Sequence, residues 1–554
     1  GFISRAEVFR GSSSALFGNA SGGMINLISE LPSNESFYGA GLTSGQYGYQ
    51  KVQVKAGNSI KNLSYMVHAS HNQNIGYRNH SNMKSFILNG KAQLEIDPLS
   101  RIRFQFSIAN SPTANDPGSL NIDQVKVDRR QAREANVQYQ AGESVSQNRL
   151  SMVYEKQVTT QFHFEGNLHY TTREFANKLP FRSGGQVQLS RTFWGGRLML
   201  LNSGNVLNIP YHLSFGVELG DQYDERRRFD NLEGIKGDKT FDQLEEFLNI
   251  GAFFQQEWIF SKSFRATFGI RSDMNKLKAT DQYLNDGDGT GKRTMNNVNP
   301  LVGFVYNFTK KINLYGNYST HFETPTLNEL SNNPDSSFSG GFNPGLNPQY
   351  AKNVEMGLKG FFNENLFFEM AAFKIDALDE IIPFELPDLP GRTFYRNAGT
   401  SERKGFECGL KSRLSKGLQL SMAYTYSDFS YGEYQTKSGV FDGNFLPAIP
   451  KKLVYGELSY FHISGIYGII QVQYIGDLFA DDANTVKDDA YQLVHMRLGY
   501  KKNYSSLLIE PFIGLNNLLN TSYNSNIRMN AWGGRYFEPG LGFNIYGGVS
   551  IRFE

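Results

Sequence analysis

The sequence predicts an all-β fold: a 22-stranded antiparallel transmembrane β-barrel preceded by a small globular segment. From Phe37 onward, the 554-residue chain is a long series of segments in which apolar and polar residues alternate. This period of two is that of a β-strand with one apolar and one polar face. The connections between the segments alternate between short and long, which is typical of an outer-membrane barrel with tight turns at one end and long loops at the other.

Composition and charge narrow the class of protein. Hydrophobic residues make up 40% of the chain and aromatic residues 14%, with 43 Phe and 30 Tyr. Aromatic residues favour pleated surfaces, and Tyr also favours the membrane–water interface. No apolar run approaches the roughly 20 residues that a membrane helix needs, but barrel strands alternate between lipid and lumen and need no such run. The formal net charge of +2 gives no signal for nucleic-acid binding.

The first 36 residues differ from the rest of the chain. They read as a strand, a Gly-rich turn, a short helical stretch over 13–18 and a second strand over 24–29. A barrel of 22 strands has a lumen too wide for its own side chains to fill, so it holds either water or a plug. We expect residues 1–36 to belong to a plug domain and residues 37–554 to form the barrel.

The strands of the barrel are expected in chain order from residue 37. The clearest alternating segments cover 39–46, 51–57, 63–71, 85–96, 101–109, 148–156 and 161–170. Short turns are expected at 97–100, 156–159, 308–310, 363–365, 414–416, 463–465 and 501–504. Long loops are expected at about 111–147, 223–248, 279–294, 321–349, 429–450 and 516–541.

The last strand is expected to close the barrel. Val549, Ile551 and Phe553 alternate with polar or small residues and should face lipid. Pairing of this strand with the first one, near 37–44, would leave no open sheet edge.

Two further strands show which face points inward. Val354 and Met356 share one face of their strand, and Glu355 lies on the other; Phe406 and Glu407 are related in the same way. A carboxylate in the lipid core would cost about 2–4 kcal/mol. Both glutamates are therefore expected to face the lumen.

The segment 3–28 resembles the end of the plug in the TonB-dependent outer-membrane receptors, in particular the siderophore receptors. The matching residues are Ile3, Arg5, Glu7, Val8, Arg10, Gly11, Ser14, Leu16, Gly18, Gly22, Gly23, Ile25 and Asn26. Ser4, Ala6 and Ser12 depart from the motif. Segments 322–330, 343–360, 397–410, 514–523 and 535–548 also resemble family patterns, so the resemblance covers essentially the whole chain.

The resemblance implies an outer-membrane transporter of a Gram-negative bacterium for active uptake of a scarce nutrient, most readily a ferric siderophore. A TonB-type energy-coupling protein would act through an N-terminal segment that precedes this plug motif in the family. That segment and most of the plug are not in the sequence, which we therefore expect to be a fragment. The alternatives are uptake of a non-iron small molecule (a cofactor, vitamin or oligosaccharide) and, if the plug is truly missing, a passive pore. Outer-membrane lipid, lipopolysaccharide and the barrel-assembly machinery are the other expected partners.

The resemblance also implies ion pairs between plug and barrel. The motif arginines Arg5 and Arg10 are expected to pair with Glu355 and Glu407, which the alternation places in the lumen. Arginine–carboxylate pairs are directional and can fix the register of two surfaces.

Candidate substrate contacts lie in the expected outer loops. The run 222–229 places Arg226, Arg227 and Arg228 beside Tyr223, a cluster that suits an anionic chelate or a carboxylate. The alternative is a charged outer loop that binds lipopolysaccharide phosphates. Further candidates are Tyr395, Arg396, Trp532, Arg535 and Tyr536.

No pattern in the sequence indicates catalysis or a bound metal. The nine His form no HxxxH pair, and the Asp/Gly-rich stretch 286–292 lacks the full ligand set of a calcium loop. We expect no enzymatic activity, no cofactor and no resident metal.

Overall fold

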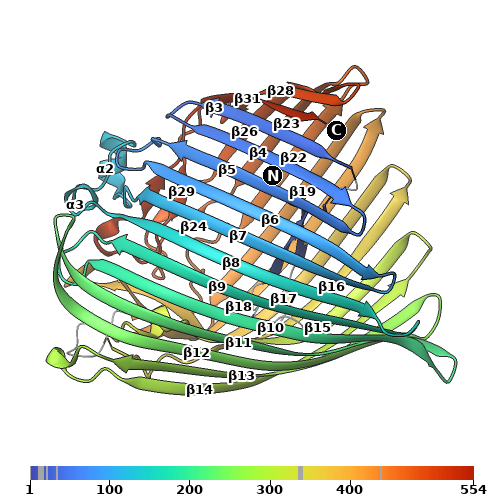
Figure 1. The fold of residues 1–554 in the computed structure, drawn as a ribbon. Helices are drawn as coiled ribbons and strands as arrows, with labels where there is room; N and C mark the ends of the chain where they lie inside the picture. Colours follow the sequence, from blue (N-terminus) through green and yellow to red (C-terminus); the bar gives the residue numbers. More distant parts are fainter. Residues whose placement is uncertain are drawn as a thin grey trace.

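The computed structural model describes residues 2–9, 18–19, 23–32, 35–334, 341–436 and 439–553. Most of its strands close into a single antiparallel barrel (Figure 1). β26 and β27 are two parts of one strand because both pair with β28, and the barrel therefore has 22 strands. The predicted fold class and strand number are confirmed.

The barrel strands run in chain order around the wall. They are β3 (Phe37–Gly45), β4 (Gln50–Ile60), β5 (Leu63–Asn74), β6 (Met83–Asp97), β7 (Ser100–Asn115), β8 (Gly142–Gln157), β9 (Phe162–Lys178), β10 (Gln186–Val206), β11 (Ile209–Leu232), β12 (Ile235–Ile259), β13 (Phe264–Asp281), β14 (Gly291–Asn307), β15 (Ile312–Glu323), β16 (Gln349–Asn363), β17 (Leu366–Leu386), β18 (Leu389–Ser415), β19 (Leu418–Tyr431), β22 (Lys452–Phe461), β23 (Ile466–Ile475), β26 (Tyr491–Tyr500), β27 (Lys502–Tyr504), β28 (Leu507–Asn516) and β31 (Asn544–Phe553).

The remaining elements are short. Outside the barrel sheet lie β1 (Ile3–Phe9), β2 (Met24–Ser29), β20 (Gln435–Thr436), β21 (Gly439–Val440), β24 (Leu478–Phe479), β25 (Lys487–Asp488), β29 (Asn524–Ile527) and β30 (Phe537–Pro539). Within the described residues, the helices are α2 (Ile122–Val127), α3 (Glu134–Gln138) and α4 (Leu327–Leu330), with 3₁₀ turns η1 (Leu284–Asp286) and η2 (Trp532–Gly534). Within the described residues, no helix is both long and apolar enough to cross a membrane.

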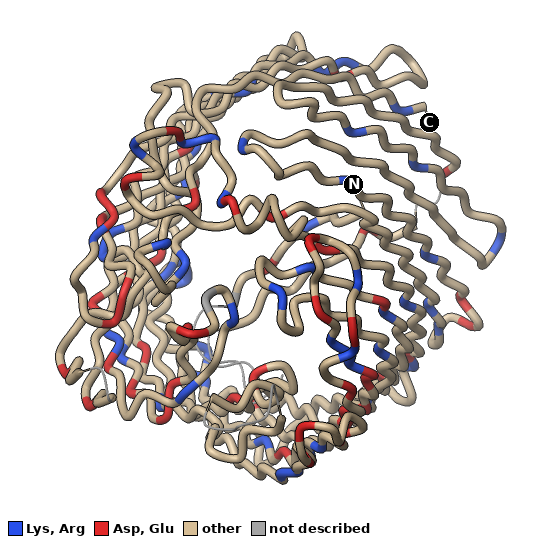
Figure 2. Tube along the Cα trace, turned by 90° about the vertical axis from the view of Figure 1, so that its left-hand side faces the viewer, with Lys and Arg blue, Asp and Glu red and all other residues tan. Residues whose placement is uncertain are grey.

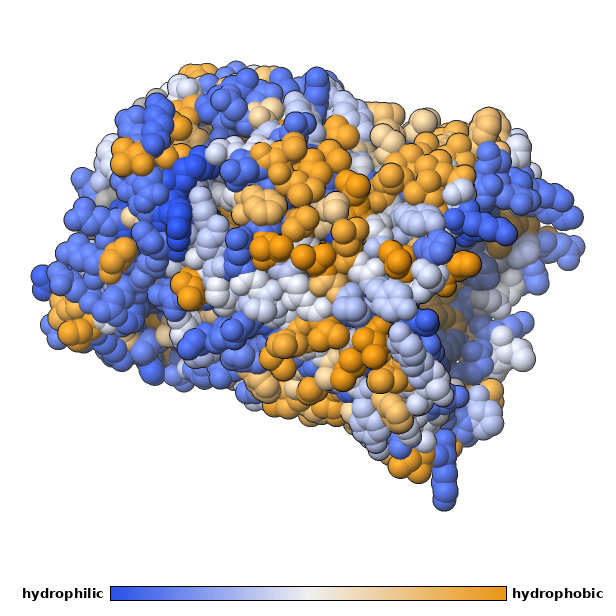
Figure 3. Space-filling model, turned by 90° about the horizontal axis from the view of Figure 1, so that it is seen from above, coloured by the Kyte–Doolittle hydropathy of each residue, from blue (hydrophilic) through white to orange (hydrophobic). Residues whose placement is uncertain are grey.

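The outer face of the barrel is apolar where it meets lipid. On β31, Val549, Ile551 and Phe553 are 38%, 45% and 53% exposed, and Val354 and Met356 on β16 are exposed in the same way. Figure 3 shows a band of hydrophobic residues across the strands between two hydrophilic ends. The predicted lipid-facing positions are confirmed by this exposure, which a water-soluble protein would not tolerate over so large an area.

The barrel closes between its first and last strands. β3 pairs with β31 in register from Tyr38 opposite Phe553 to Gly45 opposite Tyr546. The predicted closure near 37–44 is confirmed, and the barrel sheet has no open edge at this seam.

Two connections were predicted wrongly. The turn expected at 501–504 is largely strand β27, and the chain reverses after it, at Ser505. The long loop expected at 223–248 is instead a hairpin in which β11 and β12 continue to Leu232 and Ile235. The hairpin was missed because, above the membrane, both faces of its strands carry charged residues and the apolar alternation is lost.

The N-terminal segment contacts the inner wall of the barrel. β1 and β2 form a separate antiparallel sheet inside the ring of strands (Figure 1). Glu30, just after β2, forms an ion pair with Lys55 of β4, and the Lys91 Nζ atom of β6 donates to Ser29 Oγ at 2.8 Å. The predicted strand 24–29 is confirmed. Residues 13–17 of the expected helical stretch lie outside the described residues, and the assignment of 1–36 to a plug domain stays a prediction.

The long connections lie at one end of the barrel and narrow its mouth. Figure 2 looks into this end, where segments between the long strands reach across the lumen. One of them, 324–334 with α4, packs through Leu327 and Leu330 into an apolar cluster with Phe322 and Leu277 on the wall. Another, 517–543, contacts the residues just before α2 through an antiparallel backbone bridge between Leu120 and Phe537. The mouth is therefore lined by loops that are tied to each other and to the strands.

Candidate ligand-binding site

A cavity of about 380 Å³ opens at the mouth of the barrel, and we call it the basic cavity. The inner faces of β9, β10, β11 and β18 form its walls, and α4 and the loop 517–543 also border it. The charged residues in the described part of its lining are six arginines: Arg173, Arg191, Arg226, Arg228, Arg392 and Arg528. Phe175, Phe181 and Tyr395 supply aromatic surface.

Strand register brings the charges of the wall together. Arg191 on β10 lies opposite Arg173 on β9 and opposite Asp224 on β11. Asp224 in turn lies opposite Glu245 on β12. Directly opposite residues have Cβ atoms about 4.5–5.5 Å apart. Four residues that are distant in sequence thus form one row of charge across the inner wall.

Two of the arginines are neutralised by carboxylates in this wall. Arg191 makes two bonds to Asp224, at 2.8 and 2.7 Å. Arg226 makes two bonds to Glu245, at 2.7 and 3.1 Å, and both side chains are buried. These bidentate pairs fix the guanidinium groups in place.

Arg228 has no such partner. Its side chain is buried, and no carboxylate of the described residues lies within 4 Å of it. Its Nη2 atom donates to Asn332 Oδ1 at 2.9 Å, while its Nε atom is buried without a hydrogen-bond partner. Arg392 Nη2 donates to the same oxygen at 3.0 Å. Two cations therefore converge on one neutral amide.

The pKa values reflect this concentration of positive charge in the extracellular part of the barrel. Burial lowers the pKa of Arg228 well below its usual range, and the neighbouring Arg392 and Arg226 lower it further. Burial also lowers the pKa of Arg392, to about 10. An anion bound beside these groups would offset the cost of burying their charge.

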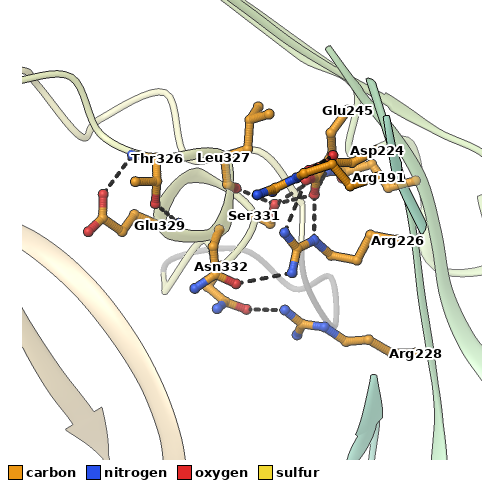
Figure 4. Close-up of polar contacts among 12 residues, drawn as sticks. Arg191, Asp224, Arg226, Arg228, Glu245, Thr326, Leu327, Glu329, Ser331 and Asn332 are labelled. Atoms are coloured by element: carbon orange, nitrogen blue, oxygen red, sulfur yellow. Dashed lines mark hydrogen bonds and ion pairs between the residues drawn. The ribbon is translucent and has the colours of Figure 1, made fainter. Parts of the chain in front are cut away.

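The α4 segment is attached to the basic wall by side-chain contacts (Figure 4). Asn328 Oδ1 accepts from Arg226 Nη1 at 3.1 Å, and Ser331 Oγ donates to Glu245 at 2.7 Å. Thr326 and Glu329 form a capping box that starts the helix, so this single turn has a defined geometry. Amide and hydroxyl groups of α4 and its flank thus occupy the hydrogen-bonding positions next to the arginines.

The structure places three of the predicted substrate contacts in this cavity: Arg226, Arg228 and Tyr395. Tyr223 does not join them. It lies on the other face of β11, 42% exposed on the outer surface, because Asp224, Arg226 and Arg228 occupy the inward positions. Tyr223 thus lies outside the lining of the basic cavity, and its role as a substrate contact stays a prediction.

The other predicted contacts hold the mouth loops together and are outside the lining of the basic cavity. Arg396 lies over the Phe384 ring, with 4.5 Å between guanidinium carbon and ring centroid, and its Nε donates to Tyr434 Oη at 2.8 Å.

Three predicted contacts lie in the loop 517–543. Arg535 Nη2 and the backbone N–H of Trp532 both reach Glu385 at the tip of β17, at 3.1 and 3.3 Å. Tyr536 packs against the apolar cluster around Leu120. The indole of Trp532 is exposed.

Four arginines of the cavity were missed in the sequence: Arg173, Arg191, Arg392 and Arg528. None belongs to a local cluster comparable to 226–228. The available signal was an arginine at an inward position of β9 and another on β10, but their alignment depends on the register of the two strands.

The plug–barrel ion pairs stay a prediction. Arg10 lies outside the described residues, and Arg5 forms an ion pair with Glu7 of its own strand at 2.6 Å. Glu355 and Glu407 lie on β16 and β18, on the two sides of β17. They are two strands apart, which corresponds to about 10 Å along the wall, so one plug surface could meet both.

Among the residues that the structure describes, no three His, Cys, Asp or Glu side chains come together as a resident metal site would require.

The model of the family described as TonB dependent receptor-like, beta-barrel, matches residues 33–518. The chain belongs to this family. It is thus an outer-membrane barrel of the TonB-dependent receptors, a family of receptors rather than enzymes.

Individual proteins show the same relationship. The iron-regulated outer membrane virulence protein of Vibrio cholerae is 28% identical over 297 residues, which are 50% of this chain and 40% of that relative. The metal-pseudopaline receptor CntO of Pseudomonas aeruginosa is 20% identical, over 100% of this chain and 80% of its own length. The chain thus matches less than half the length of the Vibrio relative.

Solved structures show the same fold. The ferric citrate transporter FecA in the unliganded form has a TM-score of 0.84 at 17% identity, covering 100% of this chain and 84% of its own. The siderophore receptor PiuA from Acinetobacter baumannii has a TM-score of 0.81 at 16% identity, covering 100% of this chain and 86% of its own.

Proposed function

We propose that this TonB-dependent receptor barrel takes up an anionic ferric chelate of the siderophore class from outside the cell. The observation that carries the proposal is the basic cavity, in which the buried Arg228 and the adjacent Arg392 face the lumen. The names of the relatives, among them a metal-pseudopaline receptor and a ferric citrate transporter, support the same class of substrate.

The chemistry of the cavity suits such a ligand. Carboxylate, catecholate and similar oxygen donors leave many ferric chelates with net negative charge. Guanidinium groups bind planar anionic groups with two parallel hydrogen bonds. The volume of about 380 Å³ is within the range of ligand pockets, roughly 300–1,000 Å³. The aromatic rings of Phe175, Phe181 and Tyr395 provide contact with the organic part of the chelate.

We further propose the partners of the transport cycle. Energy would come from a TonB-type protein, which would bind a segment that precedes this plug motif in the family. Lipid, lipopolysaccharide and the barrel-assembly machinery are proposed as partners of the outer surface. The pairing of Arg5 and Arg10 with Glu355 and Glu407 is proposed as part of the plug–barrel contact.

Affinity measurements on the full-length protein in detergent test the proposal. Ferric citrate and a ferric tris-catecholate serve as anionic ligands, and a cationic ferric hydroxamate serves as the comparison. Arg228→Gln should lower the affinity for whichever anionic chelate binds by about 10- to 100-fold, because a hydrogen bond to a charged group contributes about 1.5–3 kcal/mol.

The matched control is Arg227→Gln, on the same strand but on its outer face, where the side chain is 45% exposed. It should leave the affinity unchanged. Equal losses in both variants, or binding of the cationic chelate alone, would contradict the proposal.

A further inference from the structure

A second cavity, of about 600 Å³, lies against a different part of the wall. The hairpin between β3 and β4, the segment after β5, the upper ends of β28 and β31, and the loop 517–543 enclose it. These strands run along the upper wall in Figure 1, whereas β10–β12 of the basic cavity run along the lower one. We call it the tyrosine pocket, after Tyr47, Tyr49, Tyr77 and Tyr546 in its lining.

The aromatic surface of the pocket is fixed. Tyr47 and Tyr77 meet edge to face with 5.5 Å between their centroids. Arg130 lies over both rings, at 5.9 and 5.7 Å, and its Nε donates to the backbone carbonyl of Tyr77. Tyr546 lies close to the hairpin because residue 45 is glycine, where a Cβ atom would come within 2.8 Å of Tyr546 Cβ. The rings are therefore already held in place, so that a ligand can bind without the entropy cost of immobilising them.

The polar groups of the pocket still have hydrogen-bonding capacity. No described hydrogen bond uses the hydroxyl of Tyr47, Tyr49, Tyr77 or Tyr546. Asn74 Oδ1 is buried without a partner. The carboxylate of Glu538 forms no ion pair within 4 Å among the described residues. Acceptors and hydroxyls that lack protein partners surround the space, and a ligand rich in hydroxyl groups would satisfy both.

The charge of the pocket is balanced, unlike that of the basic cavity. Among the described residues, Arg78 is the one arginine that lines it, and its Nη2 donates to the carbonyl of Gln131 at 2.9 Å. Glu538 lies close enough to Arg78 to act on the guanidinium electrostatically. Arg78 and the nearby Arg130 are offset by the carboxylates of Glu538 and Asp116, which leaves little net attraction for a ferric chelate of high negative charge.

We propose that the tyrosine pocket binds a carbohydrate ring. Flat aromatic faces pack against the C–H face of a pyranose, while Glu538, Asn74 and the tyrosine hydroxyls exchange hydrogen bonds with its hydroxyls. The site is distinct from the one in the proposed function and depends on none of its arginines. The ring could belong to a free oligosaccharide or to a sugar unit of a larger ligand; the recognition chemistry is the same.

The test uses the full-length protein in detergent and saturation-transfer NMR with maltose, cellobiose and lactose, followed by calorimetry. At least one disaccharide should bind. Glu538→Gln and Tyr49→Phe should each weaken it by about 5- to 10-fold, the loss of one hydrogen bond. Tyr38→Phe is the matched control, since Tyr38 is on the outer face of β3 and 62% exposed. Heat-modifiable gel migration verifies that each variant is folded.

The source of the ring is tested with a glucosylated ferric catecholate and its unglucosylated parent. A glucosyl advantage that Tyr49→Phe abolishes assigns the pocket to a sugar unit of the chelate; binding of the free disaccharides alone assigns it to an oligosaccharide. Arg228→Gln should leave sugar binding intact, so failure of the anionic-chelate proposal would not affect this one. Lack of binding by all three disaccharides and no glucosyl advantage would overturn the proposal, as would equal losses in Tyr38→Phe and Tyr49→Phe.

Discussion

The two cavities at the mouth differ in charge although the same loop borders both. From the loop 517–543, Arg528 lines the basic cavity, and Ser525 and Glu538 line the tyrosine pocket. Among the described lining residues, arginines dominate in the basic cavity, whereas Arg78 in the tyrosine pocket lies near the carboxylate of Glu538. The difference shows how a barrel separates tasks: outward positions must suit lipid and the outer surface, while inward positions are free to vary from one part of the wall to the next.

The largest expected effect comes from removing the internal counter-charge of the basic cavity. Glu245→Ala leaves Arg226 buried without its carboxylate and removes one of the two acceptors of the Ser331 hydroxyl. Loss of one partner of a buried ion pair costs about 3–5 kcal/mol. We expect the barrel to unfold at a lower temperature, measured by the heat-induced change in gel migration, and the α4 segment to be cleaved faster by protease.

The control for this change is Glu225→Ala on the outer face of β11. Glu225 pairs with Arg227, and both are partly exposed, so the loss should be about 0–1 kcal/mol. Similar destabilisation by the two variants would mean that the charges of the inner wall are not coupled to the α4 segment.

The next-largest effect is expected in the pH dependence of chelate binding. The pKa of Arg392 is lowered by burial to about 10, so the group is charged at neutral pH and loses its proton as the pH rises through that value. Affinity for an anionic chelate that is stable in base should be constant from about pH 7 to 9 and fall above about pH 10, by at most about tenfold per pH unit. Calorimetry should show proton uptake on binding in that range.

The comparison is with a variant that lacks the titrating guanidinium of Arg392. Arg392→Gln should reduce the alkaline fall for the chelate, while the neighbouring Arg228, whose pKa burial also lowers, remains. A fall of unchanged size in this variant would assign it to another group.

The smallest expected difference is the response to salt. Raising the ionic strength from about 0.1 to 1 M shortens the Debye length from about 10 to 3 Å. Affinity for the anionic chelate should decrease several-fold, less than for a surface site because the cavity is partly enclosed. Affinity for the disaccharide should change little. Parallel salt dependence of the two ligands would indicate that they share one site.

The sequence predicted the barrel better than the site because the two depend on different information. Alternation within a segment, as in Val549, Ile551 and Phe553, needs only neighbouring residues, and it predicted the strands, the lipid face and the closure with β3. It failed over 223–248, where outward Glu225 and Arg227 are as polar as inward Asp224 and Arg226. Polar residues on both faces of this hairpin reflect its position outside the membrane and do not indicate a loop.

The site needed the phase and register of strands that are distant in sequence. Arg226 and Arg228 were found as a local cluster, but nothing local fixes the phase of β11, which places Tyr223 on the outer face. Arg173 and Arg191 belong to the site only because the register of β9 and β10 places them opposite each other. Arg392 and Arg528 are brought to it by the fold of the mouth loops.

The position of iron in a complex of the full-length protein tests the central claim most directly. Anomalous diffraction from crystals grown with an anionic ferric chelate locates the metal independently of the organic part. The account predicts iron in the basic cavity, with chelate oxygens bonded to Arg228 and Arg392 in place of Asn332. Iron in the tyrosine pocket, or a bound chelate that leaves both arginines on Asn332, would contradict it.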